Sequence, residues 1–131
     1  MVNLVKNSSP RIKIIQKLYS KVLNPDEKII YNKSQYKKFI KDVTEGTLER
    51  KDLIEETIIK YLDKDINLEK TDKLLKIILF SAVFELIFKH NTPKNVVISE
   101  YVKASEFFLE KSQISYLNAI LDKLSKLIRK E

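Results

Sequence analysis

The sequence contains no cysteine and no tryptophan, and its 131 residues include only one glycine, three prolines and one histidine. A chain without cysteine has no disulfide framework, no thiolate zinc site and no cysteine nucleophile. The shortage of glycine and proline argues against an all-β sandwich or barrel, because such folds need a turn signal roughly every 8–12 residues. These absences favour a helical protein and are compatible with a reducing cytoplasm.

Residues that carry enzymatic chemistry are also scarce. The single histidine, His90, lies in the polar stretch "KHNTPKN" and is predicted to be a solvated turn residue. It has no second histidine with which to form a metal pair, and the chain has no glycine-rich loop to cradle a nucleotide. We therefore expect no catalytic residue, no metal and no cofactor, and a binding or scaffolding protein rather than an enzyme.

Long hydrophobic runs are missing as well. The N-terminal residues lack the apolar core of a secretory signal. The longest apolar stretch, 74–88, is too short to span a bilayer and contains Lys76 and Glu85. The interpretation is a soluble cytoplasmic protein without a membrane partner. A basic N-terminal helix on a membrane surface is a weaker alternative, because the apolar face of that helix is needed to complete the core.

Apolar residues recur with helical period along the whole chain, which is 44% hydrophobic and 33% charged. The length suits one domain with a core of its own. Ser9 followed by Pro10 is typical of a helix start, and Asn67 or Thr71 could cap a later helix. The expected helical regions cover residues 10–24, 34–62, 69–89, 93–109 and 112–129.

Gly46 falls inside the second of these regions. Either it caps the C-terminus of a helix, or it allows a neighbouring helix to approach closely. We expect the region to be broken or kinked somewhere within residues 46–52.

The formal net charge is +7, and it is unevenly distributed. Residues 1–25 carry five basic side chains and no acidic one, whereas the rest of the chain has 20 basic and 18 acidic residues. Lys13, Lys17 and Lys21 are four residues apart, so they line one side of the first helix, opposite its apolar face. This pattern predicts a polyanionic partner at the N-terminal end. A solvated helix face is the alternative.

An acidic residue, Glu85, interrupts the most apolar stretch, "ILFSAVFELIF". A buried carboxylate is costly unless it is paired. We expect backbone donors or a base in the following segment, "TPKNVVISE", to pair with it. Glu85 is interpreted as a structural residue that ties this helix to that turn.

A series of motifs surrounds this acid. Three segments follow one another along the chain: the opening helix "PRIKIIQKLYS", then "ELIFKHNTPKNVVISEYVKAS", and then "SYLNAILDKL". Together they resemble the NusB transcription antitermination factors over nearly the whole chain. The matching positions include Ala82, Phe84, Glu85, Leu86, Pro93, Val96, Ile98, Glu100, Val102, Ala104, Leu117, Asn118, Leu121, Asp122 and Lys123.

The resemblance implies an all-α, NusB-like fold of two packed three-helix bundles, which we expect to form a single domain over residues 1–131. It also implies an adaptor without catalytic activity. NusB proteins bind boxA RNA jointly with NusE, a small-subunit ribosomal protein. They join elongating RNA polymerase and support antitermination, notably of ribosomal RNA operons. We expect a monomer or weak homodimer. The alternative is a helical protein-interaction module that kept the fold and lost specific RNA binding.

The resemblance also assigns roles to individual residues. Arg11 is the candidate phosphate-binding group, and Tyr116, at a position where the family has phenylalanine, either stacks on an unpaired base or packs as a half-buried aromatic. The expected RNA contacts are Lys6, Arg11, Lys13, Lys17 and Tyr116.

A second group of matched residues is interpreted as structural. Asn118 and Asp122 are expected to hold helix ends together. The chain also departs from the family at several positions. Asn7-Ser8-Ser9 stand where the family commonly has consecutive arginines, Phe80 replaces a usual arginine, and Leu75 replaces a frequent acid near the ribosomal-protein surface. The structural signature comprises Glu85, Pro93, Glu100, Asn118 and Asp122.

Overall fold

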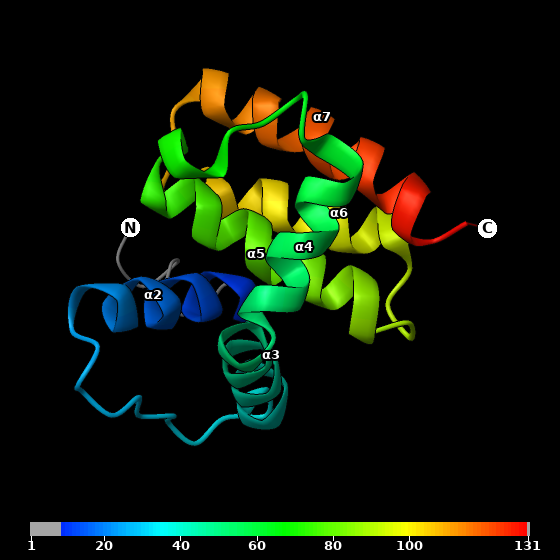
Figure 1. The fold of residues 1–131 in the computed structure, drawn as a ribbon. Coiled ribbons are helices and arrows are strands. Elements are labelled where there is room, and N and C mark those ends of the chain that lie inside the picture. Colours follow the sequence, from blue (N-terminus) through cyan, green and yellow to red (C-terminus); the bar gives the residue numbers. More distant parts are fainter. Residues whose placement is uncertain (1–8, 131) are drawn as a thin grey trace.

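The computed structural model describes residues 9–130 and consists of helices joined by turns and loops (Figure 1). The prediction of an all-helical protein is confirmed: the described residues contain α-helices and one short 3-10 helix, and no strand. The elements are α2 (Pro10–Leu23), α3 (Lys37–Glu49), α4 (Lys51–Leu62), η1 (Leu68–Lys70), α5 (Lys73–Phe88), α6 (Lys94–Ser105) and α7 (Lys111–Ile128).

Helix α5 lies at the centre of the fold. Every residue from Ile78 to Leu86 is buried, because α5 packs against each of the other helices, α2, α3, α4, α6 and α7. A helix that is apolar on all sides is stable only when neighbours surround it. The hydrophobic sequence of α5 therefore explains its central position.

The remaining helices surround α5 in two groups. Helices α5, α6 and α7 pack against one another and form a three-helix bundle. Helices α2 and α3 pack against each other and rest on α5, and α2 also contacts α6. Helix α4 contacts α3 but packs mainly on α5 and α7. In Figure 1, α7 runs along one side of α5 and α2 along the other.

Helix boundaries follow local capping groups. The Ser9 hydroxyl accepts a hydrogen bond from the Arg11 amide, with Pro10 in the first turn, as predicted. Asn67 caps only the 3-10 helix. The carboxylate of Asp72 accepts hydrogen bonds from the amides of Leu74 and Leu75, so Asp72, and neither Asn67 nor Thr71, caps α5.

The predicted break in the second region is confirmed at Arg50, between α3 and α4. Gly46 lies inside α3 with a negative φ, so it is not a left-handed cap. A Cβ at this position would overlap the ring of Phe84 from α5. The close approach of a neighbouring helix, the second of the two sequence interpretations, therefore explains the glycine.

No helix within residues 9–130 combines the length and apolar character needed to cross a membrane.

Candidate nucleic-acid interface

Five lysines on the adjacent helices α2 and α3 form no ion pair with a carboxylate of residues 9–130. Lys13, Lys17 and Lys37 line one groove, and Lys17 and Lys21 line the next. Lys41 and Lys17 both lie against the ring of Tyr31. Among the described residues, the lysines in ion pairs are others, namely Lys38, Lys89, Lys123 and Lys126. We call the unpaired set the basic face; it consists of Lys13, Lys17, Lys21, Lys37 and Lys41.

Two lysines of the basic face also hold the segment that joins α2 to α3. Lys17 Nζ donates a hydrogen bond of 2.7 Å to the carbonyl of Ile30, and Lys21 Nζ donates one of 2.7 Å to the carbonyl of Glu27. A backbone carbonyl is uncharged, so these hydrogen bonds do not neutralise the positive charge of Lys17 or Lys21. Residues 24–36, which form no helix, are thereby tied to α2.

An aromatic ring from the same segment completes this attachment. Tyr31 donates a hydrogen bond of 2.5 Å to Glu45 of α3. The ammonium groups of Lys17 and Lys41 lie 5.2 and 6.0 Å from its ring centroid. Burial and the nearby carboxylate of Glu45 raise the pKa of Tyr31, so the hydroxyl stays protonated as a donor.

The charges on the basic face repel one another. Lys13 and Lys17 lie one turn apart on α2, and both are partly buried. Burial is the main cause that lowers the pKa of Lys17, and the positive charge of Lys13 lowers it further. An anion bound between the two lysines would relieve this repulsion, so the local electrostatics favour a negatively charged ligand.

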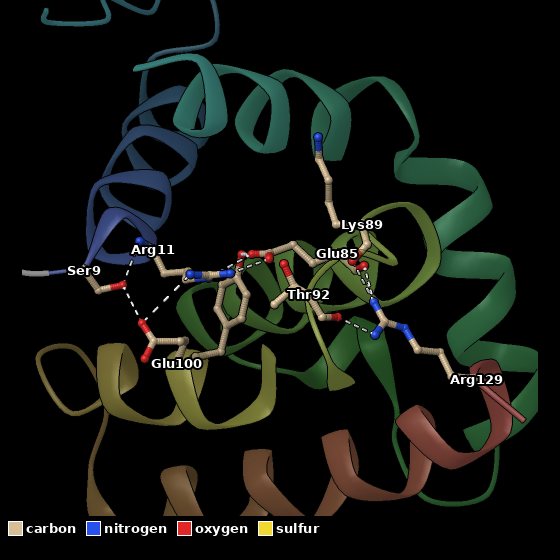
Figure 2. A network of polar contacts seen from close by, with 8 residues as sticks. Ser9, Arg11, Glu85, Lys89, Thr92, Glu100 and Arg129 are labelled. Carbon is tan, nitrogen blue, oxygen red and sulfur yellow. Dashed lines mark hydrogen bonds and ion pairs between the residues drawn. The ribbon is translucent and has the colours of Figure 1, made fainter. Parts of the chain in front are cut away.

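Arg11, predicted as a phosphate contact, has a different role in the structure. Its side chain is only 10% exposed. The guanidinium donates hydrogen bonds of 3.1 and 2.7 Å to the two carboxylate oxygens of Glu85 (Figure 2), and it stacks on the ring of Phe39 at 4.8 Å. Burial lowers the pKa of Arg11, but the hydrogen bonding and charge of Glu85, together with the charges of Tyr101 and Glu100, raise it by more. We therefore move Arg11 from the RNA contacts to the buried core.

Glu85 is completely buried and has three donors around it. Besides the two bonds from Arg11, it accepts a hydrogen bond of 2.5 Å from the hydroxyl of Tyr101 on α6. Burial and the charge of Glu85 keep the pKa of Tyr101 well above its ordinary value. Glu85 thus connects α5 with α2 and α6, and the expectation that its partner lies in the following turn is wrong.

The turn after α5 is held by a residue that the sequence interpretation missed. Arg129, at the end of α7 and 4% exposed, donates hydrogen bonds to four carbonyls of α5 and its following turn. Figure 2 shows Arg129 beside Glu85, Lys89 and Thr92. Arg129 follows buried Ser125 by four residues, so it continues the inner face of α7. This helical spacing of buried positions is the signal in the sequence that could have identified Arg129. The four acceptors are Glu85, Leu86, Lys89 and Thr92.

Tyr116 is separate from the basic face. It belongs to α7, its side chain is 39% exposed, and its hydroxyl donates a hydrogen bond of 3.1 Å to the carbonyl of Asp65. Lys123 pairs with the carboxylate of the same Asp65 at 2.7 Å. Helix α7, which carries Tyr116, lies on the other side of α5 from α2 (Figure 1), so the structure does not bring Tyr116 together with Lys13 and Lys17.

The signature residues divide into two kinds. Glu100, on α6, accepts a hydrogen bond from the Ser9 hydroxyl and lies 3.9 Å from the guanidinium of Arg11, while Pro93 is the N-cap residue of α6. Asn118 and Asp122 are exposed in the middle of α7. They do not hold helix ends, and Asp122 forms an ion pair within its own helix with Lys126. That expectation is wrong.

Two further predictions concern single residues. His90 is exposed in the turn after α5, as predicted. Lys6 lies outside the described residues. Within residues 9–130, no cluster of three or more His, Cys, Asp or Glu side chains could hold a metal ion.

The helical arrangement matches a known fold. NusB of T. maritima superimposes with a TM-score of 0.77, covering 89% of this chain and 89% of the other, at 21% sequence identity. The structure therefore defines an all-helical protein of the NusB fold with a basic face on its first two helices.

Sequence comparison identifies the family. The sequence profile of the NusB family matches residues 2–126, and the chain belongs to this family. The transcription antitermination protein NusB of Sphingopyxis alaskensis is 32% identical over 93 residues, covering 71% of this chain and 62% of that protein. The protein of the same name from Thermodesulfovibrio yellowstonii is 33% identical over 93 residues, covering 71% and 61%. The matched region thus spans about three fifths of the length of these relatives.

Proposed function

We propose that this protein is a transcription antitermination factor that binds boxA-type RNA together with the ribosomal protein NusE. In this role it joins elongating RNA polymerase in the cytoplasm and supports transcription of ribosomal RNA operons. It acts as a single-domain adaptor, monomeric or weakly dimeric, and catalyses no reaction.

One observation carries the RNA part of the proposal: in a chain of the NusB family, the basic face gathers five lysines and no ion-paired carboxylate. RNA phosphates bind such clusters by displacing condensed counterions. Lysine makes a point contact where arginine would make a planar fork, so the face is suited to backbone contacts and does not by itself read sequence.

Replacing Lys13 and Lys17 by alanine should weaken binding of a fluorescent boxA-type RNA by roughly tenfold. The two lost phosphate contacts should also reduce the slope of log affinity against log salt by about 1.4. Fluorescence anisotropy at several salt concentrations measures both quantities.

The control for this experiment is Lys126→Ala with Lys130→Ala, which removes the same charge from exposed positions at the end of α7. It should bind RNA nearly as well as the wild type. Equal losses in the two double variants would mean that only total charge matters, and would contradict binding at the basic face.

A second candidate function is a helical protein-interaction module that has lost RNA binding. It is favoured by an apolar groove between α2, α3 and α5, where Phe80 stands at a position that NusB proteins usually fill with arginine. The groove is lined by Leu18, Val22, Thr47, Leu48, Ile77 and Phe80, with Lys51, Lys73 and Lys76 among the same lining residues.

A pull-down with purified NusE, with and without boxA-type RNA, tests the partner. Under the proposal, NusE is retained and RNA increases the amount, because each ligand contributes contacts to one complex. Retention of NusE without any effect of RNA would favour the second candidate. Failure to retain NusE under both conditions would contradict the partner assignment.

A further inference from the structure

A groove separates α2 from the segment that leads into α3. Its volume is about 530 Å³, which lies within the range of roughly 300–1,000 Å³ typical of small-ligand sites. One wall is α2 and the other is formed by residues 31–37, with buried Ile40 at the side of α3. The lining residues are Lys13, Gln16, Lys17, Ser20, Tyr31, Asn32, Ser34, Lys37 and Ile40.

The charge of the groove has one sign. Three of its lining residues are lysines and none is acidic. Lys13 lines it from α2 and Lys37 from the first residue of α3, and neither forms an ion pair with any described residue. A phosphate group between these two ammonium groups would be attracted by both.

The other polar groups of the groove suit a base. Gln16 and Asn32 each offer an amide with two donors and one acceptor, the groups that pair with the edges of unpaired bases. Ser20 and Ser34 add hydroxyls that can donate or accept. A phosphate-only site would need none of these neutral groups, so the lining favours a whole nucleotide over a free inorganic anion.

The outer wall is fixed rather than formed by the ligand. Lys17, Lys21 and Tyr31 tie the segment to α2 and α3 through the three hydrogen bonds described above. A wall held in place loses less conformational entropy on binding. Besides the phosphate contact proposed for it above, Lys17 therefore positions the wall of the groove. Lys13 and Lys37 are the cations proposed to hold the phosphate of the bound nucleotide.

We propose that this groove binds one unpaired nucleotide of single-stranded RNA, with its phosphate between Lys13 and Lys37 and its base edge facing Gln16 and Asn32. The inference deepens the RNA-binding function proposed above and rests on it. It adds a specific compartment for a base to a face that otherwise contacts only phosphates.

Filling the groove without changing its charge tests the proposal. Ser20→Trp places a large ring at the α2 wall, and Asn32→Trp does so at the opposite wall; both positions are exposed, so either variant can be used if the other fails to fold. Each should weaken binding of the fluorescent boxA-type RNA at least tenfold and reduce the salt slope by about 0.7, the contribution of one phosphate. Ser112→Trp, exposed on α7, is the matched control and should bind within twofold of the wild type.

The possible outcomes separate the two proposals. If Lys13→Ala with Lys17→Ala weakens RNA binding while both groove-filling variants bind like the wild type, RNA uses only the outer surface and the groove proposal is overturned. If the wild type binds no RNA, the proposed function fails and the groove proposal fails with it.

Nuclear magnetic resonance distinguishes the two sources of phosphate. Addition of a single-stranded RNA should shift the side-chain amide signals of Gln16 and Asn32. Inorganic phosphate at the same phosphate concentration should leave those two amide signals unchanged. Equal shifts with both would mean a simple anion site and would contradict a nucleotide compartment.

Discussion

Replacing Arg11 by methionine should lower the free energy of unfolding by about 3–5 kcal/mol, because it leaves the carboxylate of Glu85 buried without its cation. Glu85 is 0% exposed and receives two of its three side-chain hydrogen bonds from Arg11. The remaining donor, Tyr101, cannot neutralise the charge. Urea unfolding followed by circular dichroism measures the change.

The reciprocal variants show what this ion pair contributes. Glu85→Leu should also be destabilising, since it leaves the Arg11 guanidinium and the Tyr101 hydroxyl without their acceptor. The double variant, Arg11→Met with Glu85→Leu, should recover much of the loss, because an apolar pair of similar size has no desolvation penalty to offset. Additive losses in the double variant would show that the two residues are not coupled.

An exposed ion pair on the surface provides the control for these Arg11 and Glu85 variants. Asp122 and Lys126 form an ion pair of 3.2 Å on α7, with side chains 59% and 67% exposed. Solvent and salt screen such a pair, so Lys126→Met should cost less than about 1 kcal/mol. If Arg11→Met cost no more than Lys126→Met, the buried network would not stabilise the fold as we infer.

Replacing Arg129 by methionine should lower the free energy of unfolding by about 3 kcal/mol. The guanidinium satisfies carbonyls at the end of α5, including those of Leu86 and Lys89, at 2.9 and 3.0 Å. Hydrogen bonds from a charged donor contribute about 1.5–3 kcal/mol, and a cation at a helix C-terminus also interacts favourably with the helix dipole. Methionine keeps the apolar part of the side chain and removes all the donors.

Hydrogen exchange locates this effect. In the Arg129→Met protein, the amide of Thr92, which donates to the carbonyl of Lys89, should exchange faster, because the turn that Arg129 holds can open locally. Arg129→Lys should give an intermediate loss, since one ammonium group cannot reach carbonyls spread over the turn. The neighbouring exposed residue provides the control, and Lys130→Met should leave stability within about 0.5 kcal/mol. Equal stability of the Arg129→Met and Lys130→Met proteins would contradict the role given to Arg129.

Features that depend on neighbouring residues in the chain were predictable. Ser9 and Pro10 mark the start of α2, and the lysines at positions 13, 17 and 21 share one side of it, because helical geometry alone fixes both. The central position of α5 also follows from its own sequence, because a helix that is apolar on all sides needs neighbours around it. The structure confirms that the predicted row of lysines lies on α2, whereas RNA binding by this row stays a prediction.

Features that depend on packing were not predictable in the same way. Arg11 and Lys13 are two residues apart and equally basic in the sequence, yet Arg11 turns inward and Lys13 faces the groove. The difference arises from Glu85, which is 74 positions away in the chain. No local pattern connects two residues at that separation.

The sequence by itself determined which segments are helical, which helix is central, and which end of the protein is basic, because periodicity and charge are local properties. The tertiary structure alone decided that Glu85 pairs with Arg11 and Tyr101 while Arg129 closes the end of α5. It also decided that residues 24–36 fold back on α2 to form a groove. The physical reason is that a buried charge takes the partner that packing brings within hydrogen-bonding distance, wherever that partner lies in the sequence.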